Sequence, residues 1–291
     1  MTKKEIKIGN KTISYKSPTF IIAEIGINHN GSLEICKKLI DMAVETGCSA
    51  VKFQKRDSDT CVPDNQKNII RDTPWGQMTY LEYRKRIEFG KDEYTAIDNY
   101  CKEKDIIWFA SPWDTISVDF LEQFGVPCYK VASACITDID LLERIKATKK
   151  PVILSTGMST IEQITKAVNI LGKENIILLH STSTYPCAIN ELNLNVIIML
   201  KEKFDCLVGY SGHESITYPS VVAVVLGACV IERHITIDRA SYGSDQAASL
   251  ERRGLQIMCD EINNMPIYLG DGIKTIYESE KPLIEKLRRV K

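Results

Sequence analysis

The sequence predicts a (β/α)8 barrel, also called a TIM barrel, from two features that repeat along the chain. Eight short apolar runs alternate with segments of helical character, and nearly every run ends in polar side chains. Such alternation indicates parallel strands joined by helices, and 291 residues are enough for one barrel of roughly 250 residues with small additions. The runs are FIIAEIG, SAVKFQK, IIWFASP, CYKVAS, PVILSTG, IILLHS, CLVGYSGH and CVIERHIT.

The first elements follow local patterns. EIKIGNKTISY alternates apolar and polar residues around Gly9 and Asn10, which predicts a β-hairpin that could close the N-terminal mouth of the barrel. After the first strand, Ser32 is the expected N-cap of a helix whose apolar residues share one face and which stops at Gly47. We therefore expect a hairpin segment within residues 1–18, followed by the first strand and helix.

Residues 57–90, here called the excursion, form the longest stretch without strand or helix periodicity. The excursion follows the second strand, at the end of the barrel where the polar residues gather. Long loops at this end often cover a site, but a surface segment with one or two short helices fits the sequence equally well.

The remaining elements complete the predicted barrel. Thr137, Ser159 and Thr217 are the expected N-caps of the helices after the fourth, fifth and seventh strands. LERRGLQIMCDEINNMPIYLG predicts a final helix, and residues 271–291 read as a charged tail. We expect a single domain over residues 1–291.

Composition narrows the classes of partner. Lys and Arg total 37 and Asp and Glu total 38, so a net charge of −1 gives no field that attracts nucleic acid or an anionic membrane. The chain has no apolar stretch of about 18 residues and its first residues lack an apolar signal core, which predicts a cytoplasmic protein. The ten cysteines form no CxxC pair, as expected of reduced thiols.

Two lysines at strand ends predict an anion site. Lys52 alternates with Phe53 and so shares the side of Gln54, and Lys130 repeats the arrangement two strands later. An inward lysine is costly unless an anion meets it, although a lone lysine at a strand end could also reach solvent. Four serines at strand ends favour a cradle for phosphate, or for phosphate with a carboxylate. They are Ser111, Ser133, Ser155 and Ser211.

Two histidines predict a metal site. His213 and His234 end the seventh and eighth strands, which are neighbours in a barrel. Two imidazoles at the rim of one cavity suit a divalent cation, whereas a single one is more often a hydrogen-bonded structural residue. Glu24, on the adjoining first strand, could orient a ligand or transfer a proton.

Several strings, taken together and in order, resemble the catalytic barrel of sialic acid synthases. These are enzymes that condense phosphoenolpyruvate with a sugar to make nine-carbon 2-keto-3-deoxy sugar acids. The resemblance runs from about Thr19 to Leu287. The strings are AEIGINHNGS, AVKFQ, KVAS, LSTGMS, TYP, GYSGH, ERHIT and DRASYGSDQAASLE.

The resemblance implies a role for each matching residue. His213 and His234 would bind Mn²⁺ or Mg²⁺, which polarises the aldehyde of an N-acylated hexosamine such as N-acetylmannosamine. Phosphoenolpyruvate C3 would then attack the aldehyde carbon, water would add at C2, and phosphate would leave, as in transferases of the EC 2.5.1 type. The implied phosphoenolpyruvate ligands are Lys52, Ser111, Lys130, Ser133, Ser155 and Ser211. The implied acceptor ligands are Gln54, Tyr185 and Asp245. The expected catalytic residues are Glu24, Lys52, Lys130 and His234.

Three departures from the family pattern concern the acceptor. Cys135 and Thr184 stand where relatives commonly have glutamates. The chain also ends before the antifreeze-like domain of many relatives, so a homodimer is expected without exchange of that domain. With no extra basic cluster evident, the sequence favours a non-phosphorylated amino sugar as the acceptor.

Two other functions stay open on the sequence alone. Lys130 or Lys52 could serve a Schiff-base sugar acid aldolase, because a buried barrel lysine can have a depressed pKa. A barrel that binds a sugar or a phosphate without turnover is the other alternative, motivated by Cys135 and the missing domain.

Overall fold

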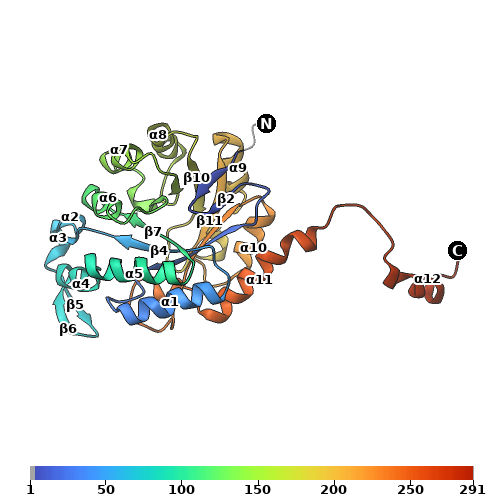
Figure 1. Ribbon diagram of the computed structural model, residues 1–291, viewed down its shortest axis with the longest axis horizontal. Helices are drawn as coiled ribbons and strands as arrows, with labels where there is room; N and C mark the ends of the chain where they lie inside the picture. The colour runs from blue at the N-terminus through green and yellow to red at the C-terminus, as the bar shows by residue number, and fades with distance from the viewer. Residues whose placement is uncertain (1–3, 291) are drawn as a thin grey trace.

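The computed structural model describes residues 4–290 and contains a closed barrel of eight parallel strands (Figure 1). Around the barrel the strands follow the order β10, β11, β12, β3, β4, β7, β8, β9. Each strand coincides with one of the eight apolar runs, so the predicted fold class is confirmed. The bounds are β3 Phe20–Gly26, β4 Ala50–Lys55, β7 Ile107–Pro112, β8 Tyr129–Val131, β9 Val152–Ser155, β10 Ile176–Ser181, β11 Leu207–Gly212 and β12 Val230–His234.

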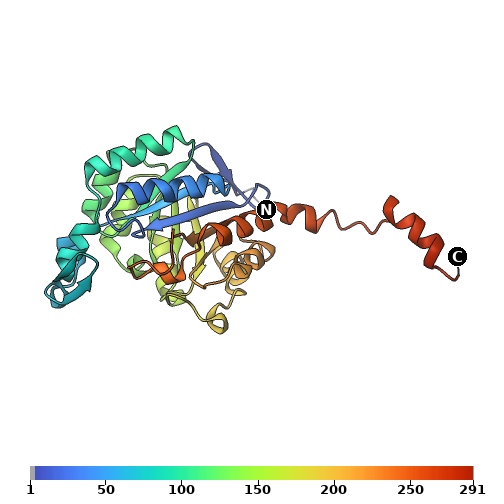
Figure 2. The ribbon, with the colours of Figure 1, turned by 90° about the horizontal axis from the view of Figure 1, so that it is seen from below.

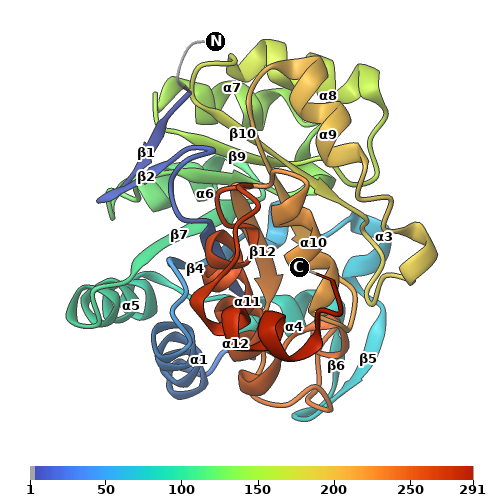
Figure 3. The same cartoon turned by 90° about the vertical axis from the view of Figure 1, so that its right-hand side faces the viewer.

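A helix follows every barrel strand and packs on the outside of the barrel (Figure 3). The first begins after Ser32, whose side chain accepts a hydrogen bond from the Ile35 backbone as predicted. The bounds are α1 Leu33–Glu45, α5 Lys91–Glu103, α6 Thr115–Glu122, α7 Ile139–Ala147, α8 Ile161–Leu171, α9 Val196–Phe204, α10 Tyr218–Val225 and α11 Arg252–Leu269. Short 3-10 turns lie at η1 Ser133–Cys135, η2 Ile189–Glu191, η3 Gln246–Ala248 and η4 Glu278–Glu280.

Two predicted helix caps are wrong by one residue. Thr160, not Ser159, caps α8, because its hydroxyl accepts from the Gln163 backbone while the Gln163 side chain accepts from the Thr160 backbone. Asp138, not Thr137, caps α7. In both places two neighbouring residues can act as caps, and the one whose side chain reaches the third helical N–H takes the position.

The core lies inside the barrel and between the barrel and its helices. All seven residues of β3 are buried, as expected of a parallel strand covered on both faces. The hairpin of β1 (Ile6–Ile8) and β2 (Lys11–Ile13) buries Ile8 and Ile13 in the same core, and a side chain at its turn residue Gly9 would meet the side chain of Ile107 at the start of β7. The hairpin therefore covers the N-terminal end of the barrel.

The excursion contains more structure than the sequence predicts. It has three helices, α2 (Ser58–Cys61), α3 (Asp64–Lys67) and α4 (Tyr80–Ile87), and the hairpin of β5 (Ile70–Thr73) and β6 (Gly76–Thr79). These two strands are short and mostly exposed, so they carry no clear apolar alternation. Figure 2 shows the excursion, in cyan, at the opposite end of the barrel from the C-terminal segment.

After α11 the chain leaves the barrel and ends in the short helix α12 (Lys281–Leu287) (Figure 1). Residues 1–3 of the predicted hairpin segment and residue 291 of the predicted tail lie outside the described residues. Within residues 4–290, none of the helices combines the length and the apolar character needed to cross a bilayer.

Candidate active site

A cavity of about 150 Å³ lies at the C-terminal ends of the barrel strands. Eleven of the twelve predicted site residues line it, and the twelfth, Asp245, lies just outside, against His234. Six further residues line the cavity without having been predicted. The predicted residues are Glu24, Lys52, Gln54, Ser111, Lys130, Ser133, Ser155, Tyr185, Ser211, His213 and His234; the additional ones are Trp113, Ala132, Ala134, Met158, Ser183 and Glu232.

Lys52 lies at the centre of the first polar cluster. Its Nζ is 2.9 Å from Glu24 Oε2 and donates a hydrogen bond of 2.9 Å to Ser111 Oγ. Gln54, two residues along β4, donates through Nε2 to the other oxygen of Glu24 at 3.2 Å. The side chain of Lys52 is only 4% exposed, so its charge is balanced by protein groups and not by water.

Glu232 is the centre of the second cluster, and it was absent from the predicted site. Its Oε1 accepts from Lys130 Nζ at 3.0 Å and from Ser211 Oγ at 3.0 Å, and its Oε2 lies 3.9 Å from Lys52 Nζ. Burial would raise the pKa of Glu232, but the charges of Lys130 and Lys52 outweigh burial and lower it. Its place two residues before His234 on one strand is the signal that could have identified it.

Burial lowers the pKa of Lys130, although the negative charge of Glu232 acts to raise it. The cavity thus holds two ammonium groups and two carboxylates, Lys52 and Lys130 with Glu24 and Glu232, all nearly free of solvent contact. An anion entering the cavity meets cations that have already lost their water, and it competes with carboxylates for them.

The two predicted metal ligands lie side by side at the rim. The ring centroids of His213 and His234 are 5.4 Å apart, and Tyr185 packs 4.0 Å from the His213 ring. Nδ1 of His213 is 2.7 Å from the Thr182 carbonyl and must donate to it, which leaves Nε2 free as an acceptor. Burial, and then the charge of His234, lower the pKa of His213 to about 3, so its ring is neutral at physiological pH.

His234 has a buried Nδ1 without a hydrogen-bond partner, and Asp245 Oδ2 lies 3.7 Å from it. Among residues 4–290, no group of three or more His, Cys, Asp or Glu side chains is arranged to hold a metal ion. A cation at the two imidazoles would therefore take further ligands from water or substrate.

A buried network fixes the loop between the two histidine-bearing strands. Arg233 donates through Nη1 to Glu214 Oε1 at 2.8 Å, to the Ile216 carbonyl at 2.9 Å and to Ser220 Oγ at 3.0 Å. Tyr210 donates to the second carboxylate oxygen of Glu214 at 2.8 Å. Arg233 immediately precedes one histidine and Glu214 immediately follows the other, so this network sets the spacing of the two rings.

Hydrogen-bonding atoms without partners gather at the cavity. Of the twelve buried side-chain atoms that lack a hydrogen-bond partner in the described part of the chain, seven belong to cavity-lining residues. Buried polar groups are normally paired, and each unpaired one requires an explanation. A polar ligand in the cavity would supply the missing partners. The seven are Glu24 Oε2, Gln54 Oε1, Trp113 Nε1, Ser155 Oγ, Ser183 Oγ, Glu232 Oε2 and His234 Nδ1; Glu24 Oε2 is ion-paired with Lys52 Nζ at 2.9 Å, so the other six remain without a polar contact at hydrogen-bond distance within residues 4–290.

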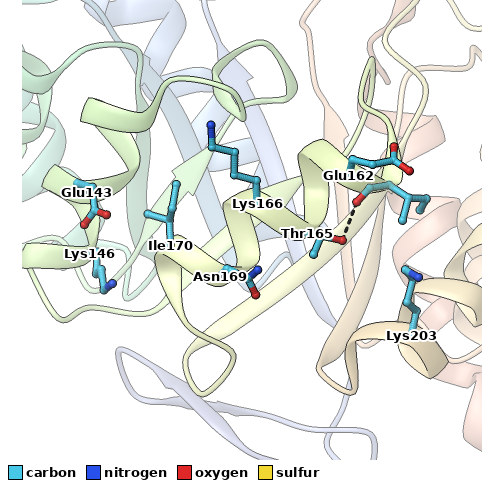
Figure 4. Close-up of a pocket in the computed structure, with 9 residues that line it drawn as sticks. Glu143, Lys146, Glu162, Thr165, Lys166, Asn169, Ile170 and Lys203 are labelled. Carbon is cyan, nitrogen blue, oxygen red and sulfur yellow. Dashed lines mark hydrogen bonds between the residues drawn. The ribbon is translucent and has the colours of Figure 1, made fainter.

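A larger hollow of about 650 Å³ lies elsewhere, over α7 and α8 on the outside of the barrel. Figure 4 shows its charged residues, among them Glu143 and Lys146 on α7 and Lys203 on α9. It shares no residue with the cavity at the strand ends. The smaller cavity is the candidate active site, because only there do buried charges from several strands converge.

Comparison with known proteins identifies the family of this chain. The model of the NeuB family matches residues 39–274. The chain belongs to the NeuB family. It is 37% identical to the N,N'-diacetyllegionaminic acid synthase of Campylobacter jejuni, over 93% of this chain and 83% of that protein. It is also 37% identical to the human N-acetylneuraminate-9-phosphate synthase, over 93% of this chain and 76% of that protein.

A solved structure shows the same architecture for a NeuB-like barrel. The N-acetylneuraminic acid (sialic acid) synthetase of Leptospira borgpetersenii, in complex with citrate, superposes with a TM-score of 0.85 at 34% identity and covers 99% of both chains. The resemblance to sialic acid synthases is thus confirmed at the level of the family. The named relatives are synthases of nonulosonic acids, so this NeuB-family chain belongs to a family of enzymes.

The two substituted positions of this NeuB-family chain differ in their surroundings. Cys135 is buried behind the cavity wall in η1, and burial raises the pKa of its thiol to about 12, so the thiol is neutral. Thr184 is exposed and does not line the cavity. Neither residue lines the cavity, and neither carries the negative charge of the glutamate that the resemblance implies at its position.

Proposed function

We propose that this chain is a nonulosonate synthase that condenses phosphoenolpyruvate with the open-chain aldehyde of an N-acylated hexosamine. The products are a nine-carbon 2-keto-3-deoxy sugar acid and phosphate. The observation that carries the proposal is one cavity holding two buried lysines, Lys52 and Lys130, beside two buried imidazoles, His213 and His234. A homodimer in the cytoplasm stays a prediction.

The donor fits the lysine side of the cavity. Phosphoenolpyruvate carries a phosphate and a carboxylate, and the ammonium groups of Lys52 and Lys130 can each meet one of them. Ser155 Oγ, which is buried and unpaired, supplies a further donor. Ser111 and Ser211 already donate to or accept from the charged groups and can turn toward the ligand.

The two imidazoles fit a divalent cation, Mn²⁺ or Mg²⁺. His213 is held neutral with Nε2 free, and His234 has an unpaired buried nitrogen, so both have nitrogen lone pairs available. A cation bound there would supply Lewis acidity toward an aldehyde oxygen. Asp245 and Tyr185, which lie against these rings, are placed to contact the acceptor sugar.

The chemistry balances with the residues present. Phosphoenolpyruvate C3 forms a bond to the aldehyde carbon, the oxygen of a water bonds to C2, and the C2–O bond to phosphate breaks to leave a ketone. The two protons of that water end on the new hydroxyl and on phosphate. Glu24, next to Lys52 and Gln54, is placed to accept one of them and pass it on. Lys52 and Lys130 stabilise the departing phosphate.

The acceptor sugar is not fixed by family membership, because the relatives include synthases of different nonulosonic acids. The proposal is tested by measuring phosphate release from phosphoenolpyruvate with a panel of N-acylhexosamines, with and without Mn²⁺. We expect release that requires both the acceptor and the metal, and that a chelator abolishes. Absence of release with every acceptor would overturn the proposal.

Borohydride trapping distinguishes this synthase from the Schiff-base aldolase alternative. A Schiff-base aldolase forms an imine between a lysine and pyruvate, which borohydride reduces to a stable adduct. The Nζ atoms of Lys52 and Lys130 each contact a carboxylate oxygen, of Glu24 at 2.9 Å and of Glu232 at 3.0 Å, and these contacts hold both nitrogens away from attack on a carbonyl carbon. We expect no adduct after borohydride treatment with pyruvate, as measured by intact mass.

A further inference from the structure

Arg56 and Trp113 form a stacked pair at the C-terminal end of the barrel. Arg56 directly follows β4 and Trp113 directly follows β7, and these strands are hydrogen-bonded neighbours. The Trp113 backbone N–H donates to the Lys55 carbonyl at 3.0 Å, which fixes the two residues relative to each other. The guanidinium carbon lies 3.6 Å from the centroid of the indole ring, and Trp113 lines the cavity. The pair thus extends the cavity wall outward.

Both members of the pair carry a donor without an acceptor. Arg56 Nη1 and Trp113 Nε1 are buried and have no hydrogen-bond partner within residues 4–290. Neither nitrogen can accept, so only an acceptor atom can satisfy them. Two unpaired donors in one stacked pair therefore favour a ligand that brings oxygen acceptors, and an anionic oxygen is the strongest acceptor.

No carboxylate in the described part of the chain forms a direct ion pair with Arg56. Glu88 and Asp245 are the acidic residues whose charge acts on Arg56 most strongly. Glu88 already accepts from Lys55 Nζ at 2.9 Å and from the Arg56 backbone N–H at 3.1 Å. Asp245 lies beside His234. The Arg56 guanidinium is therefore available to pair with an anionic group of a bound ligand.

The neutral side chain of Cys135 leaves the positive charge of Arg56 without a carboxylate to offset it at that position. Cys135 stands where the resemblance places a glutamate, and its thiol is neutral because burial raises its pKa, with the positive charge of Arg56 as the opposing influence. A carboxylate there would partly cancel the guanidinium. The chain thus has a neutral thiol at Cys135, where the resemblance implies a carboxylate, and a positively charged guanidinium at Arg56 on the same side of the cavity.

We infer that Arg56 and Trp113 form an oxyanion subsite that selects an acceptor sugar bearing an anionic substituent away from its aldehyde. The inference rests on the proposed function and names the acceptor class for the same cavity. Lys52 and Lys130 serve the donor. Arg56 and Trp113 follow the C-terminal ends of β4 and β7, beyond Lys52 and Ser111 on the same strands, so the substituent that they meet belongs to the end of the acceptor away from its aldehyde. The sequence favours a non-phosphorylated amino sugar, an expectation that this inference reverses if the substituent is a phosphate.

The test compares acceptors that share one ring. N-acetylmannosamine, its 6-phosphate and the corresponding 6-carboxylate are assayed by phosphate release from phosphoenolpyruvate. We expect the wild-type kcat/KM to favour at least one anionic acceptor by tenfold or more, as roughly expected for a charged hydrogen bond, and the two anions to show whether phosphate or carboxylate fits. Arg56→Gln should remove that preference and leave the neutral sugar within about threefold, a change well below a charged hydrogen bond.

A matched control is available in the excursion. Arg86 lies over the ring of Trp75 at 4.8 Å, is exposed, and is not part of the cavity, so Arg86→Gln should leave the preference unchanged. Cys135→Glu provides a second variant that keeps Arg56. The added carboxylate should lower the preference for anionic acceptors by partly cancelling the guanidinium.

Binding separates a failure of this inference from a failure of the proposed function. Calorimetric titration of each sugar into chelator-treated protein measures affinity without turnover. If no acceptor yields phosphate but Arg56→Gln weakens binding of the anionic sugars alone, the subsite stands and the proposed function fails. If wild type prefers the neutral sugar, or if Arg56→Gln leaves both the binding and the kcat/KM ratios unchanged, the subsite is overturned.

Discussion

Arg233 Nη1 lies 2.8 Å from Glu214 Oε1 in an ion pair that is completely buried behind the two site histidines. The pair joins β12, which ends in His234, to the turn after β11, which carries His213. Because its donors and acceptors are also bound by Tyr210, Ser220 and backbone carbonyls, the spacing of the imidazoles is a property of the folded scaffold.

Removing one member of this pair should be strongly destabilising. Arg233→Met leaves the Glu214 carboxylate buried without its cation, and we expect the free energy of unfolding to fall by about 3–5 kcal/mol. Urea denaturation followed by circular dichroism measures it. Arg252→Met is the matched control, since the Arg252–Glu45 pair is exposed and should contribute less than about 1 kcal/mol. Equal losses in the two variants would contradict a structural role for the buried pair.

His234→Ala should abolish Mn²⁺ binding and metal-dependent phosphate release. The variant removes one of two imidazoles, and no third protein ligand compensates for it within residues 4–290. The free Mn²⁺ signal in electron paramagnetic resonance reports binding directly. His29→Gln serves as the control, because His29 is buried against Phe89 and does not line the cavity. Full activity in the His234 variant would rule out its role as a ligand.

Ser155→Ala and Ser133→Ala should separate binding from stability. Within residues 4–290 Ser155 Oγ has no hydrogen-bond partner, so its loss should not lower the free energy of unfolding, whereas it should weaken phosphoenolpyruvate binding about tenfold. Ser133 Oγ accepts from the Gly157 N–H at 3.1 Å, and its loss leaves that buried donor unpaired at a cost of about 1–2 kcal/mol. Denaturation and calorimetry on both variants check the contrast. A Ser155 variant that unfolds more easily than the Ser133 variant would speak against it.

Acid should destabilise the protein partly through His29. Burial lowers the pKa of His29 from 6.5 to about 3, so between these pH values the unfolded chain binds a proton that the folded chain does not. Stability is therefore full above pH 6.5 and falls as the pH falls, by about 2 kcal/mol between pH 7 and pH 5 for this residue.

His29→Gln should reduce that loss, as measured by urea unfolding at the two pH values. Part of the slope should persist, because the pKa of His213 is lowered in the same direction. An unchanged slope in the variant would show that His29 is already protonated in the folded state or does not control the transition.

The barrel and most of the cavity could be predicted because their signals are local. A parallel strand covered on both faces is a continuous apolar run, and alternation within it puts Lys52 and Gln54 on one side. The hairpin of β5 and β6 could not be predicted, since short exposed strands carry no alternation.

Two residues of the site depended on contacts between distant strands. From the sequence Glu232 could be recognised as a polar strand end close to His234, but its contacts with lysines on two other strands could not be predicted. Arg56 was missed because only the pairing of β4 with β7 brings it onto Trp113. In both cases the residue type alone is compatible with a solvated strand end, and the partner lies more than 50 residues away in the sequence.

Because the unpaired atoms around the cavity can be paired by a ligand, the thermal stability of the protein should increase when a ligand binds there. A molecule that satisfies these atoms binds only the folded state, so at a hundred times its Kd it should raise stability by about 2.7 kcal/mol. Melting temperature then ranks phosphoenolpyruvate, metal ions and candidate sugars without any need for turnover. Buried polar atoms that cost folding free energy, such as Ser155 Oγ and Trp113 Nε1, thereby become the means of identifying the ligand that pairs with them.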